Sequence, residues 1–239
     1  MGTKVLAIII AAMVVFATLG IICILNSGND TTGKILIDGD DELVAYVESH
    51  GLDGSGVPDD PFMLKDMTIS ISSNETALSI SNTSLSVIIE NCLVKGEYAP
   101  KGTETGSIGI LLRNVIDTCI QDINVTECRY GIVIEKCENI TIAGSYLASY
   151  SDGSWQGSDL WAFIASDSEY LTLDHSMVRG ILCLDRCENG LIANNDFSGT
   201  DGLVLRSSSN ISVHDNKIGA RYTSLMIADS FDVHCANNR

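Results

Sequence analysis

The stretch SSNISVHDNK (residues 208–217) is followed 22 positions later by SFDVHCANNR (residues 230–239), and the two align without a gap. The pattern extends back to residue 78 as pairs of apolar residues separated by one position. The second members of these pairs are Ile80, Leu112, Ile134, Ala165, Leu184, Leu205 and Ile227, at steps of 32, 22, 31, 19, 21 and 22 residues. A recurring period of about 22 residues indicates a solenoid of stacked repeats.

Three further columns keep this register. Eight positions after each second member stands an apolar residue, at Ile88, Ile120, Ile142, Leu173, Ile192, Val213 and Cys235. Thirteen positions after it stand Leu93, Val125, Leu147, Val178, Phe197 and Ile218. Between these columns, eleven positions after the second member, Asn and Ser predominate, at Asn91, Ser145, Ser176, Asn195, Asn216 and Asn238. We expect this last column to form a buried ladder, because stacked amides supply one another with donors and acceptors.

Each repeat holds three short segments rich in Leu and β-branched residues, broken by Gly, Asn, Asp and Ser, and none has helical periodicity. A unit of about 22 residues cannot bury its apolar face alone, so neighbouring units must stack. Three strands per turn, each paired with its equivalent one turn on, make each turn rise about 4.8 Å. The sequence therefore predicts an all-β fold, a right-handed parallel β-helix of about seven coils.

The charge balance limits the classes of partner. Acidic residues number 31 against 14 basic ones, a net charge of −17. Nucleic-acid binding needs a basic face and is not expected. The eight Cys show no CxxC spacing and do not indicate a disulfide scaffold, although one bridge, for example between Cys183 and Cys187, stays open.

The chain before the repeats divides into four parts. Residues 1–4 are expected in the cytoplasm, and residues 5–25 hold 21 positions without a charge. That length spans about 31 Å, enough for a bilayer core, so we favour an uncleaved signal anchor over a cleaved signal peptide. Residues 26–37 are predicted as a linker. Residues 38–61 are predicted as an N-terminal cap, with a helix over 40–51 and an opening turn.

The β-helix is predicted over residues 62–239. Its last coil is incomplete at Arg239, so we expect this end to continue or to be covered by a partner. Insertions at 96–107 and 148–160 leave equivalent points two coils apart, about 10 Å along the axis. Loops on one side of a solenoid are typical binding surfaces. The candidate ligand-binding residues are therefore those of the two insertions, namely Tyr98, Tyr150, Asp152, Trp155 and Asp159.

The opening stretch GLDGSGVPDDPFMLKDMTI (51–69), taken with the repeats, resembles the archaeal right-handed parallel β-helix repeat proteins known as NosD-like. Their opening pattern GxGTxxDPYxI appears here as GSGVPDDPFML, with Val57 and Pro58 where the Thr would stand. The resemblance covers about residues 51–239. It implies the β-helix fold and, through the family's label, a copper-accessory role in nitrous oxide reductase maturation.

Catalysis is not expected. The Gly-His-Gly and Arg-x-Lys elements of β-helix polysaccharide hydrolases do not occur in the sequence. Arg113, Glu135 and Arg206 do not assemble into the basic and acidic set of a lyase. The paired carboxylates at 40–41 and 59–60 are assigned to the cap and the opening turn. We therefore expect a chain that is not an enzyme and carries no cofactor.

A metal site is not expected either. His175, His214 and His234 stand near Asp and Cys residues, an arrangement that suits a transition metal. In register, however, these three histidines do not share a column, so their imidazoles are not predicted to meet.

Six Asn-x-Ser/Thr sequons are candidate glycosylation sites, at Asn29, Asn74, Asn82, Asn124, Asn139 and Asn210. Together these features predict a membrane-anchored, outward-facing β-helix with a structural or adhesive role at the cell surface, or one that binds a polysaccharide or glycoprotein. A carbohydrate-active enzyme (lyase, hydrolase or epimerase) whose catalytic coils are not evident here is one alternative. A copper-accessory periplasmic protein is the second, and it depends on the resemblance alone.

Overall fold

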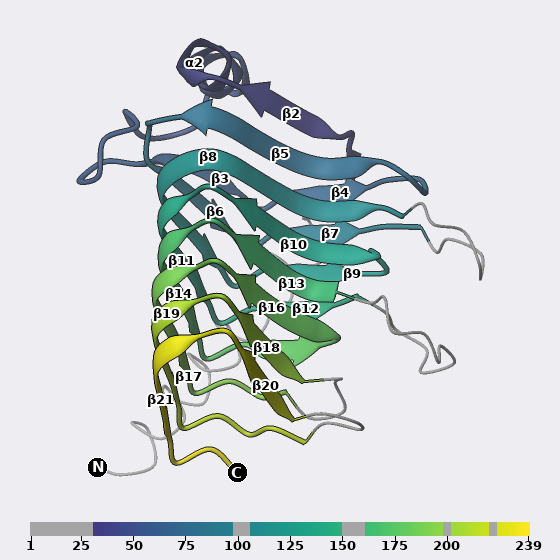
Figure 1. Cartoon of the computed structure of the whole chain (residues 1–239). Helices are drawn as coiled ribbons and strands as arrows, with labels where there is room; N and C mark the ends of the chain where they lie inside the picture. The colour runs from purple at the N-terminus through teal and green to yellow at the C-terminus, as the bar shows by residue number, and fades with distance from the viewer. Residues whose placement is uncertain (1–30, 98–105, 150–160, 198–201, 220–223) are drawn as a thin grey trace, which may run out of the picture. The chain divides into compact units, whose positions relative to one another are not determined.

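The strands of this protein pair in parallel with their equivalents one coil away. The computed structural model describes residues 31–97, 106–149, 161–197, 202–219 and 224–239. All pairings between named strands are parallel. The paired strands form a six-stranded and a 15-stranded sheet, which curl around a common interior (Figure 1). The predicted all-β parallel β-helix is therefore confirmed.

Three stacks of strands make up the solenoid. Stack A contains β1 (Thr31–Thr32), β4 (Thr68–Ser70), β7 (Leu93–Lys95), β9 (Asn124–Thr126), β12 (Tyr146–Ala148) and β15 (Met177–Arg179). Stack B contains β2 (Ile35–Asp38), β5 (Thr76–Thr83), the first half of β8 (Ile108–Gln121), β10 (Tyr130–Glu135), β13 (Trp161–Ser166), β16 (Ile181–Asp185), β18 (Leu203–Arg206) and β20 (Leu225–Ala228). Stack C contains β3 (Phe62–Lys65), β6 (Val87–Glu90), the second half of β8, β11 (Glu138–Ala143), β14 (Glu169–Asp174), β17 (Glu188–Ala193), β19 (Ser209–His214) and β21 (Phe231–Ala236).

The solenoid begins earlier than the sequence indicated. Residues 26–37 were expected to be a linker, but β1 pairs with β4 and β2 pairs with β5. The reason is that Ile35 and Ile37 alternate with the exposed residues Leu36 and Asp38 and bury their side chains against the first full coil. The predicted linker therefore does not extend beyond residue 30.

Helix α2 (Asp40–His50) lies beside β2 and β5 at this end of the solenoid (Figure 1). It buries Leu43 and Val47, and it stops at Gly51, which adopts the left-handed conformation. Asp40 joins the helix to the first coil, because its carboxylate accepts hydrogen bonds from Thr83 Oγ1 (2.6 Å), the Ser84 backbone N–H (2.9 Å) and Ser84 Oγ (3.1 Å). The helix thus covers open strand edges at the N-terminal end.

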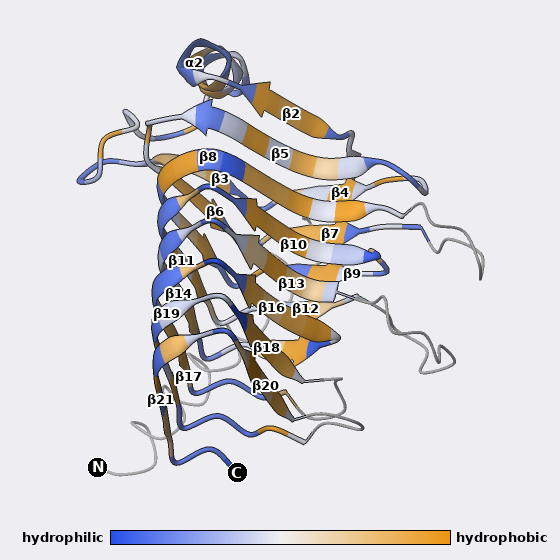
Figure 2. Ribbon diagram, in the orientation of Figure 1, coloured by the Kyte–Doolittle hydropathy of each residue, from blue (hydrophilic) through white to orange (hydrophobic). Residues whose placement is uncertain are grey.

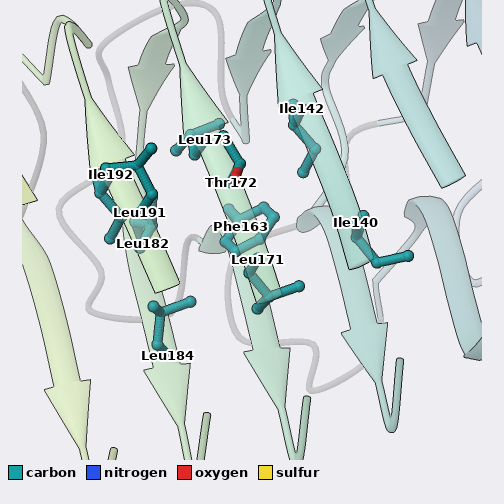
Figure 3. Close-up of a pocket in the computed structure, with 10 residues that line it drawn as sticks. All are labelled: Ile140, Ile142, Phe163, Leu171, Thr172, Leu173, Leu182, Leu184, Leu191 and Ile192. Atoms are coloured by element: carbon teal, nitrogen blue, oxygen red, sulfur yellow. The ribbon is translucent and has the colours of Figure 1, made fainter. Parts of the chain in front are cut away.

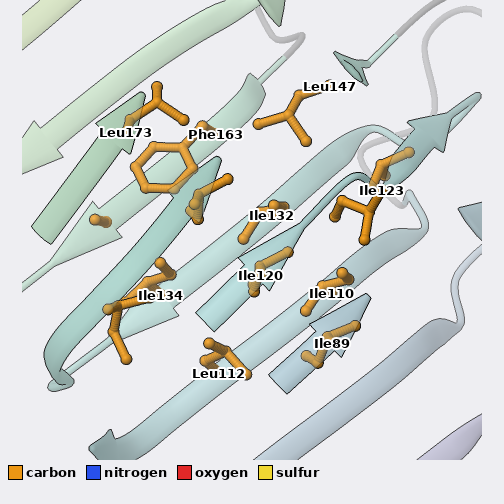
Figure 4. Close-up of a cluster of buried hydrophobic side chains, with 14 of the residues drawn as sticks. Ile89, Ile110, Leu112, Ile120, Ile123, Ile132, Ile134, Leu147, Phe163 and Leu173 are labelled. Atoms are coloured by element: carbon orange, nitrogen blue, oxygen red, sulfur yellow. The ribbon is translucent and has the colours of Figure 1, made fainter. Parts of the chain in front are cut away.

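Inward-facing aliphatic side chains from all three stacks form the core. Figure 4 shows Ile110, Ile132 and Ile120 stacked with neighbours from adjacent coils. Each fully buried side chain of this size contributes about 1.5–3 kcal/mol before entropy is subtracted. On the last coil the inward side chains are only partly covered, and Ile227 is 45% exposed.

One corner differs from the sequence-based register. The coil that contains β5 and β6 carries one extra residue between Thr83 and Val87, so Ile89, not Ile88, pairs with Ile120 and faces inward. The same shift moves Cys92 into the column assigned to Asn91. A one-residue slip reverses the face of every following side chain in a strand. Consequently Leu93 is 39% exposed, while Val94 is buried.

The predicted Asn/Ser ladder lies at the corner between stacks C and A. Each side-chain oxygen accepts the backbone N–H of the residue one coil before. Ser145 Oγ accepts that of Ile123 at 3.3 Å, and Ser176, Asn195, Asn216 and Asn238 each accept that of the preceding member at 2.8–3.1 Å. Asn91 is not a member, because its side chain donates to Asp66 on the surface.

A second ladder, which the sequence analysis missed, lies at the corner between stacks B and C. Its column is Thr83, Val115, Cys137, Ser168, Cys187, Ser208 and Ser230. Serine hydroxyls accept backbone N–H groups from the coil before, at 2.9 Å from Cys137 to Ser168 and 3.0 Å from Cys187 to Ser208. Ser and Cys alternate here because both are small and can hydrogen-bond the chain locally.

Polar residues with positive φ mark the corners. One such column precedes the second ladder and consists of Asn82, Asn114, Lys136, Asp167, Arg186, Ser207 and Asp229, with φ between 48° and 55°. A second column consists of Asp117, Asn139, Tyr170, Asn189, Asn210 and Asp232. Figure 2 shows hydrophilic residues along this edge of the solenoid and hydrophobic residues along the strands. Asn and Asp are favoured there because their short side chains tolerate the left-handed region.

Among the described residues, none of the helices has the length and apolar character to cross a membrane. The anchor predicted over residues 5–25 falls outside that part of the chain.

Candidate functional site

The ligand-binding residues predicted from the sequence cannot be placed. Tyr98, Tyr150, Asp152, Trp155 and Asp159 all fall within 98–105 or 150–160, outside the described residues. Those two segments follow β7 and β12 of stack A. The site that the described residues do form lies on stack C instead.

This site is a surface groove of about 210 Å³ between the opening turn and stack C, which we call the proline groove. One wall is formed by Pro58 and Pro61. The floor and the other wall come from three successive coils, with Ser86, Val87 and Ile88 at β6, Asp117, Thr118 and Cys119 on β8, and Asn139 and Thr141 on β11.

The opening turn is fixed against β6 by its glycines and by backbone bonds. Gly56 O accepts the Ser86 N–H at 2.8 Å, and Ser86 O accepts the Phe62 N–H at 2.9 Å. Gly54 has φ +104, a conformation that only glycine adopts freely, and a Cβ there would lie 2.0 Å from Pro61 O. The segment Gly54–Gly56, part of the opening pattern GSGVPDDPFML, therefore holds Pro58 and Pro61 in place as one wall of the groove.

Asp117 and Asn139 form the polar centre of the groove. Both lie in one column of positive φ, and Asn139 Nδ2 donates to Asp117 Oδ1 at 2.5 Å. Their exposed atoms present a carboxylate acceptor beside an amide group, which can donate and accept. Thr141 adds an outward hydroxyl on the same strand as Asn139.

Ser86 is the unusual member of the groove. It is 2% exposed, and its Oγ has no hydrogen-bond partner within the described structure. A buried hydroxyl without a partner costs about 1–3 kcal/mol, so such groups are rare in folded proteins. Ser86 is therefore a buried hydroxyl in the lining of the groove that the fold itself leaves without a partner.

Cys119 is the only thiol in the lining of the groove. Burial, and then the nearby Glu90 carboxylate, raise the pKa of Cys119 above its usual value. Its Sγ lies 3.7 Å from Gln121 Oε1. A raised pKa keeps the thiol protonated, which argues against a nucleophilic or metal-binding role.

The interior offers a second, much smaller cavity of about 10 Å³ beneath β11, β14 and β17 (Figure 3). Its lining is almost entirely aliphatic and includes Ile140, Phe163 and Leu182. About one water-sized probe fits such a volume, and apolar cavities stay empty of water. It is a packing defect, not a binding site.

The residues that the structure describes do not fit a copper ion. Copper takes imidazole, thiolate or thioether ligands. His175 Nδ1 pairs with Asp174 at 2.7 Å and His214 Nδ1 with Asp215 at 2.8 Å, but these two histidines lie in different columns. Within the described ranges, no three His, Cys, Asp or Glu residues are placed to hold a metal.

The buried thiols among the described residues do not suit a copper ion either. Burial raises the pKa of Cys187 to about 11 and that of Cys128 to about 11, so both are held as neutral thiols. Cys183 and Cys187, the pair left open for a disulfide, are both free and buried.

Five of the six sequons lie in the described part of the chain, and all five asparagines are exposed. Asn82, Asn139 and Asn210 occupy corner columns, where their side-chain amides bond to the coil before. Asn124 stands on the outer face of β9, and Asn74 in the turn before β5. Asn29 falls outside the described residues.

The fold and the groove together define a parallel β-helix protein with a small polar surface site. The family model described as periplasmic copper-binding protein (NosD) matches residues 99–239, more than half of the chain, and the chain belongs to this family. The description supports the coarser expectation of an extracytoplasmic location. It does not bear on the archaeal origin that the resemblance implied.

The solved structures with similar folds are distant. Full-length tailspike protein 2 of Escherichia coli bacteriophage CAB120 is 12% identical, with 70% of this chain and 30% of that chain covered and a TM-score of 0.46. The periplasmic alginate epimerase AlgG is 12% identical, with 84% and 68% covered and a TM-score of 0.40. This chain thus spans about a third of the tailspike's length, and these similarities show the fold alone. No curated protein matches the sequence.

These structures correct one prediction. We expected a chain that is not an enzyme, and that prediction is contradicted, since the similar structures include an epimerase and the enzymatically active domain of bacteriophage CBA120 tailspike protein 2. The absence of hydrolase motifs was no sufficient ground for it, because β-helix enzymes of different classes use different residues on the same scaffold.

Proposed function

We propose that this protein binds a neutral saccharide in the proline groove, on the outer side of the cytoplasmic membrane. The observation that carries the proposal is the combination of the Asp117–Asn139 pair with the unpartnered hydroxyl of Ser86. Sugar hydroxyls both donate and accept hydrogen bonds, and this groove is lined by a carboxylate, an amide and three hydroxyl side chains within one small volume.

The groove also provides apolar surface for the carbon face of a sugar. Pro58, Pro61 and Ile88 line it beside the polar groups. Binding sites commonly combine an apolar lining with a few placed polar groups. At about 210 Å³ it is smaller than the pockets of about 300–1,000 Å³ that enclose drug-sized ligands. It therefore fits one sugar unit, either a chain end or a branch.

The charge of the groove selects for a neutral ligand. Its lining contains one carboxylate, Asp117, and no Lys, Arg or His. The whole chain carries a net charge of −17. A uronate or a phosphorylated sugar would be repelled by both, so polyuronates are not expected to bind.

The test is binding by the purified full chain to neutral oligosaccharides of glucose, mannose and galactose and to oligouronates. We expect binding to a neutral sugar and none to the uronates. Asp117→Asn keeps a residue that tolerates positive φ but removes the charged acceptor, which contributes about 1.5–3 kcal/mol. Affinity should then fall about tenfold or more.

Asp122→Asn is the matched control. Asp122 has φ +52, against +48 at Asp117, and follows β8 at the next corner, outside the groove. Equal losses in the two variants would show that charge at a distance, not the groove, governs binding. Reducing-end assays of the bound sugars belong in the same experiment, since release of product would make the groove an active site.

For the location we propose that residues 5–25 anchor the β-helix to the membrane. The support is the run of 21 uncharged residues after Lys4. A structural or adhesive role at the cell surface follows if the bound sugar belongs to the cell envelope. Recovery of the chain in the membrane fraction after high-salt washing, with residues 31–239 accessible to external protease, would support this arrangement.

A further inference from the structure

The outer face of stack A carries a row of apolar side chains with one asparagine in it. Leu93, Asn124, Tyr146 and Met177 lie in register on four successive coils. Leu93 is 39% and Met177 40% exposed, whereas outward positions on strands usually carry polar residues. Asn124 begins the sequon Asn-Val-Thr (124–126), and Val125 between its polar members is buried.

The side chain of Asn124 is not used in the fold. Its backbone N–H donates to Cys92 O at 2.8 Å, but its exposed amide group makes no side-chain hydrogen bond to any described residue. The amide nitrogen can therefore carry a substituent without breaking a contact. Coils spaced about 4.8 Å apart place Leu93 on one side of it and Tyr146 on the other.

Three of the other four described sequons differ in this respect, whereas Asn74, in the turn before β5, likewise makes no side-chain hydrogen bond to a described residue but has no row of exposed apolar side chains beside it. Asn82 Nδ2 donates to Asp38 Oδ1 at 2.6 Å, Asn139 Nδ2 to Asp117 Oδ1 at 2.5 Å, and Asn210 Nδ2 to Asn189 Oδ1 at 2.7 Å. Each of these nitrogens points along the solenoid to the neighbouring coil. A sugar attached to such a nitrogen would have to fit between two coils or displace the bond, whether it is added before or after folding.

We propose that Asn124 is an N-glycosylated residue of this β-helix, and that its first sugar lies over Tyr146 and Leu93. In the transfer, Nδ2 of Asn124 forms a bond to the anomeric carbon of an activated glycosyl phosphate. The bond from that carbon to the phosphate oxygen breaks, the phosphate leaves with the electron pair, and Nδ2 loses one proton. The carbon face of the sugar then covers the tyrosine ring, which has an apolar body suited to this contact.

Mass spectrometry of the full chain, isolated from its own cells, tests the proposal directly. Trypsin separates the sites, because Asn124 lies alone in peptide 114–129, Asn139 in 137–179 and Asn210 in 207–217. We expect a glycan on 114–129 and unmodified Asn139 and Asn210. An unmodified Asn124, or occupancy of Asn139 and Asn210 equal to that of Asn124, would overturn the proposal.

Two variants expressed in the same cells test the contact. Asn124→Gln should remove the glycan mass and lower the melting temperature by about 2–4 °C, the shift that a loss of about 1 kcal/mol produces in a domain of this size. In a Tyr146→Ala background the same substitution should remove the glycan without further change in the melting temperature. If it still lowers the melting temperature there, the sugar does not rest on Tyr146. Asn124→Gln leaves the proline groove intact, so saccharide binding reports separately on the proposed function.

Discussion

Asn216 Oδ1 accepts two hydrogen bonds from Asn195, one from its backbone N–H at 2.9 Å and one from its side-chain Nδ2 at 3.1 Å. Asn216 Nδ2 in turn donates to Ile192 O at 2.8 Å and to Asn238 Oδ1 at 3.0 Å. Asn216 is fully buried. The amide therefore has a partner for each donor and for its acceptor, and this is how a polar residue occupies the interior of a coil.

Replacing Asn216 with Asp should destabilise the domain. The carboxylate keeps the acceptor but loses both donors, so Ile192 O loses its bond to Asn216 and Asn238 Oδ1 faces a charge. We expect a loss of about 2–3 kcal/mol, measured by urea unfolding at pH 7. Burial would raise the pKa of the new carboxyl, so the loss should shrink as the pH falls and the group becomes neutral. In chain produced without glycosylation, Asn124→Asp, at an exposed position, is the control and should change stability little.

The ladder at the corner between stacks B and C can be tested at Ser208 with one substitution that removes the hydrogen bond and one that partly restores it. Ser208 Oγ accepts the Cys187 N–H at 3.0 Å and donates to Arg206 O at 2.8 Å, and Ser208 is fully buried. Ser208→Ala leaves that N–H unpaired and should cost about 1–3 kcal/mol. Ser208→Cys should recover part of this loss, because cysteines already occupy the column at Cys137 and Cys187. Equal unfolding midpoints for the Ala and Cys variants would contradict the ladder.

Much of the fold could be predicted because parallel coils place equivalent residues directly over one another. Columns such as Ile132–Phe163–Leu182 therefore repeat in sequence. The predicted register was wrong at one corner, where an extra residue between Thr83 and Val87 places Cys92 in the column that had been assigned to Asn91. A single inserted residue leaves no clear signal in composition or periodicity.

The groove was harder to predict than the core. Its residues come from the opening turn and from three coils, and Pro61 and Asn139 are 78 positions apart in the sequence. One signal was available, since Asp117 and Asn139 are 22 residues apart and therefore share a column. The missing partner of Ser86 depends on side-chain packing between the opening turn and β6, which no periodicity describes.

The attachment of helix α2 should depend on pH. The hydrogen bond from Thr83, and then that from the Ser84 N–H, hold the pKa of Asp40 below its usual value. A depressed pKa in the folded state contributes stability above the unfolded pKa of about 3.9, and that stability is lost as the pH falls through the folded value. Below about pH 4, amide exchange in α2 should therefore accelerate before exchange in the core strands does. Asp40→Ala should show the fast exchange at pH 7, and Asp41→Ala should not, because it makes no such bonds.

Ser86→Ala separates the binding role of this hydroxyl from its effect on stability. Removing a buried hydroxyl that has no partner takes away a cost of about 1–3 kcal/mol and creates a void of only one atom. The melting temperature should therefore stay unchanged or rise, in contrast to Ser208→Ala in the ladder. If the hydroxyl meets a sugar oxygen, saccharide affinity should fall about fivefold or more, which corresponds to the loss of one neutral hydrogen bond. A variant that binds normally and is less stable would show that Ser86 serves the fold, and the groove would lose its main support as a binding site.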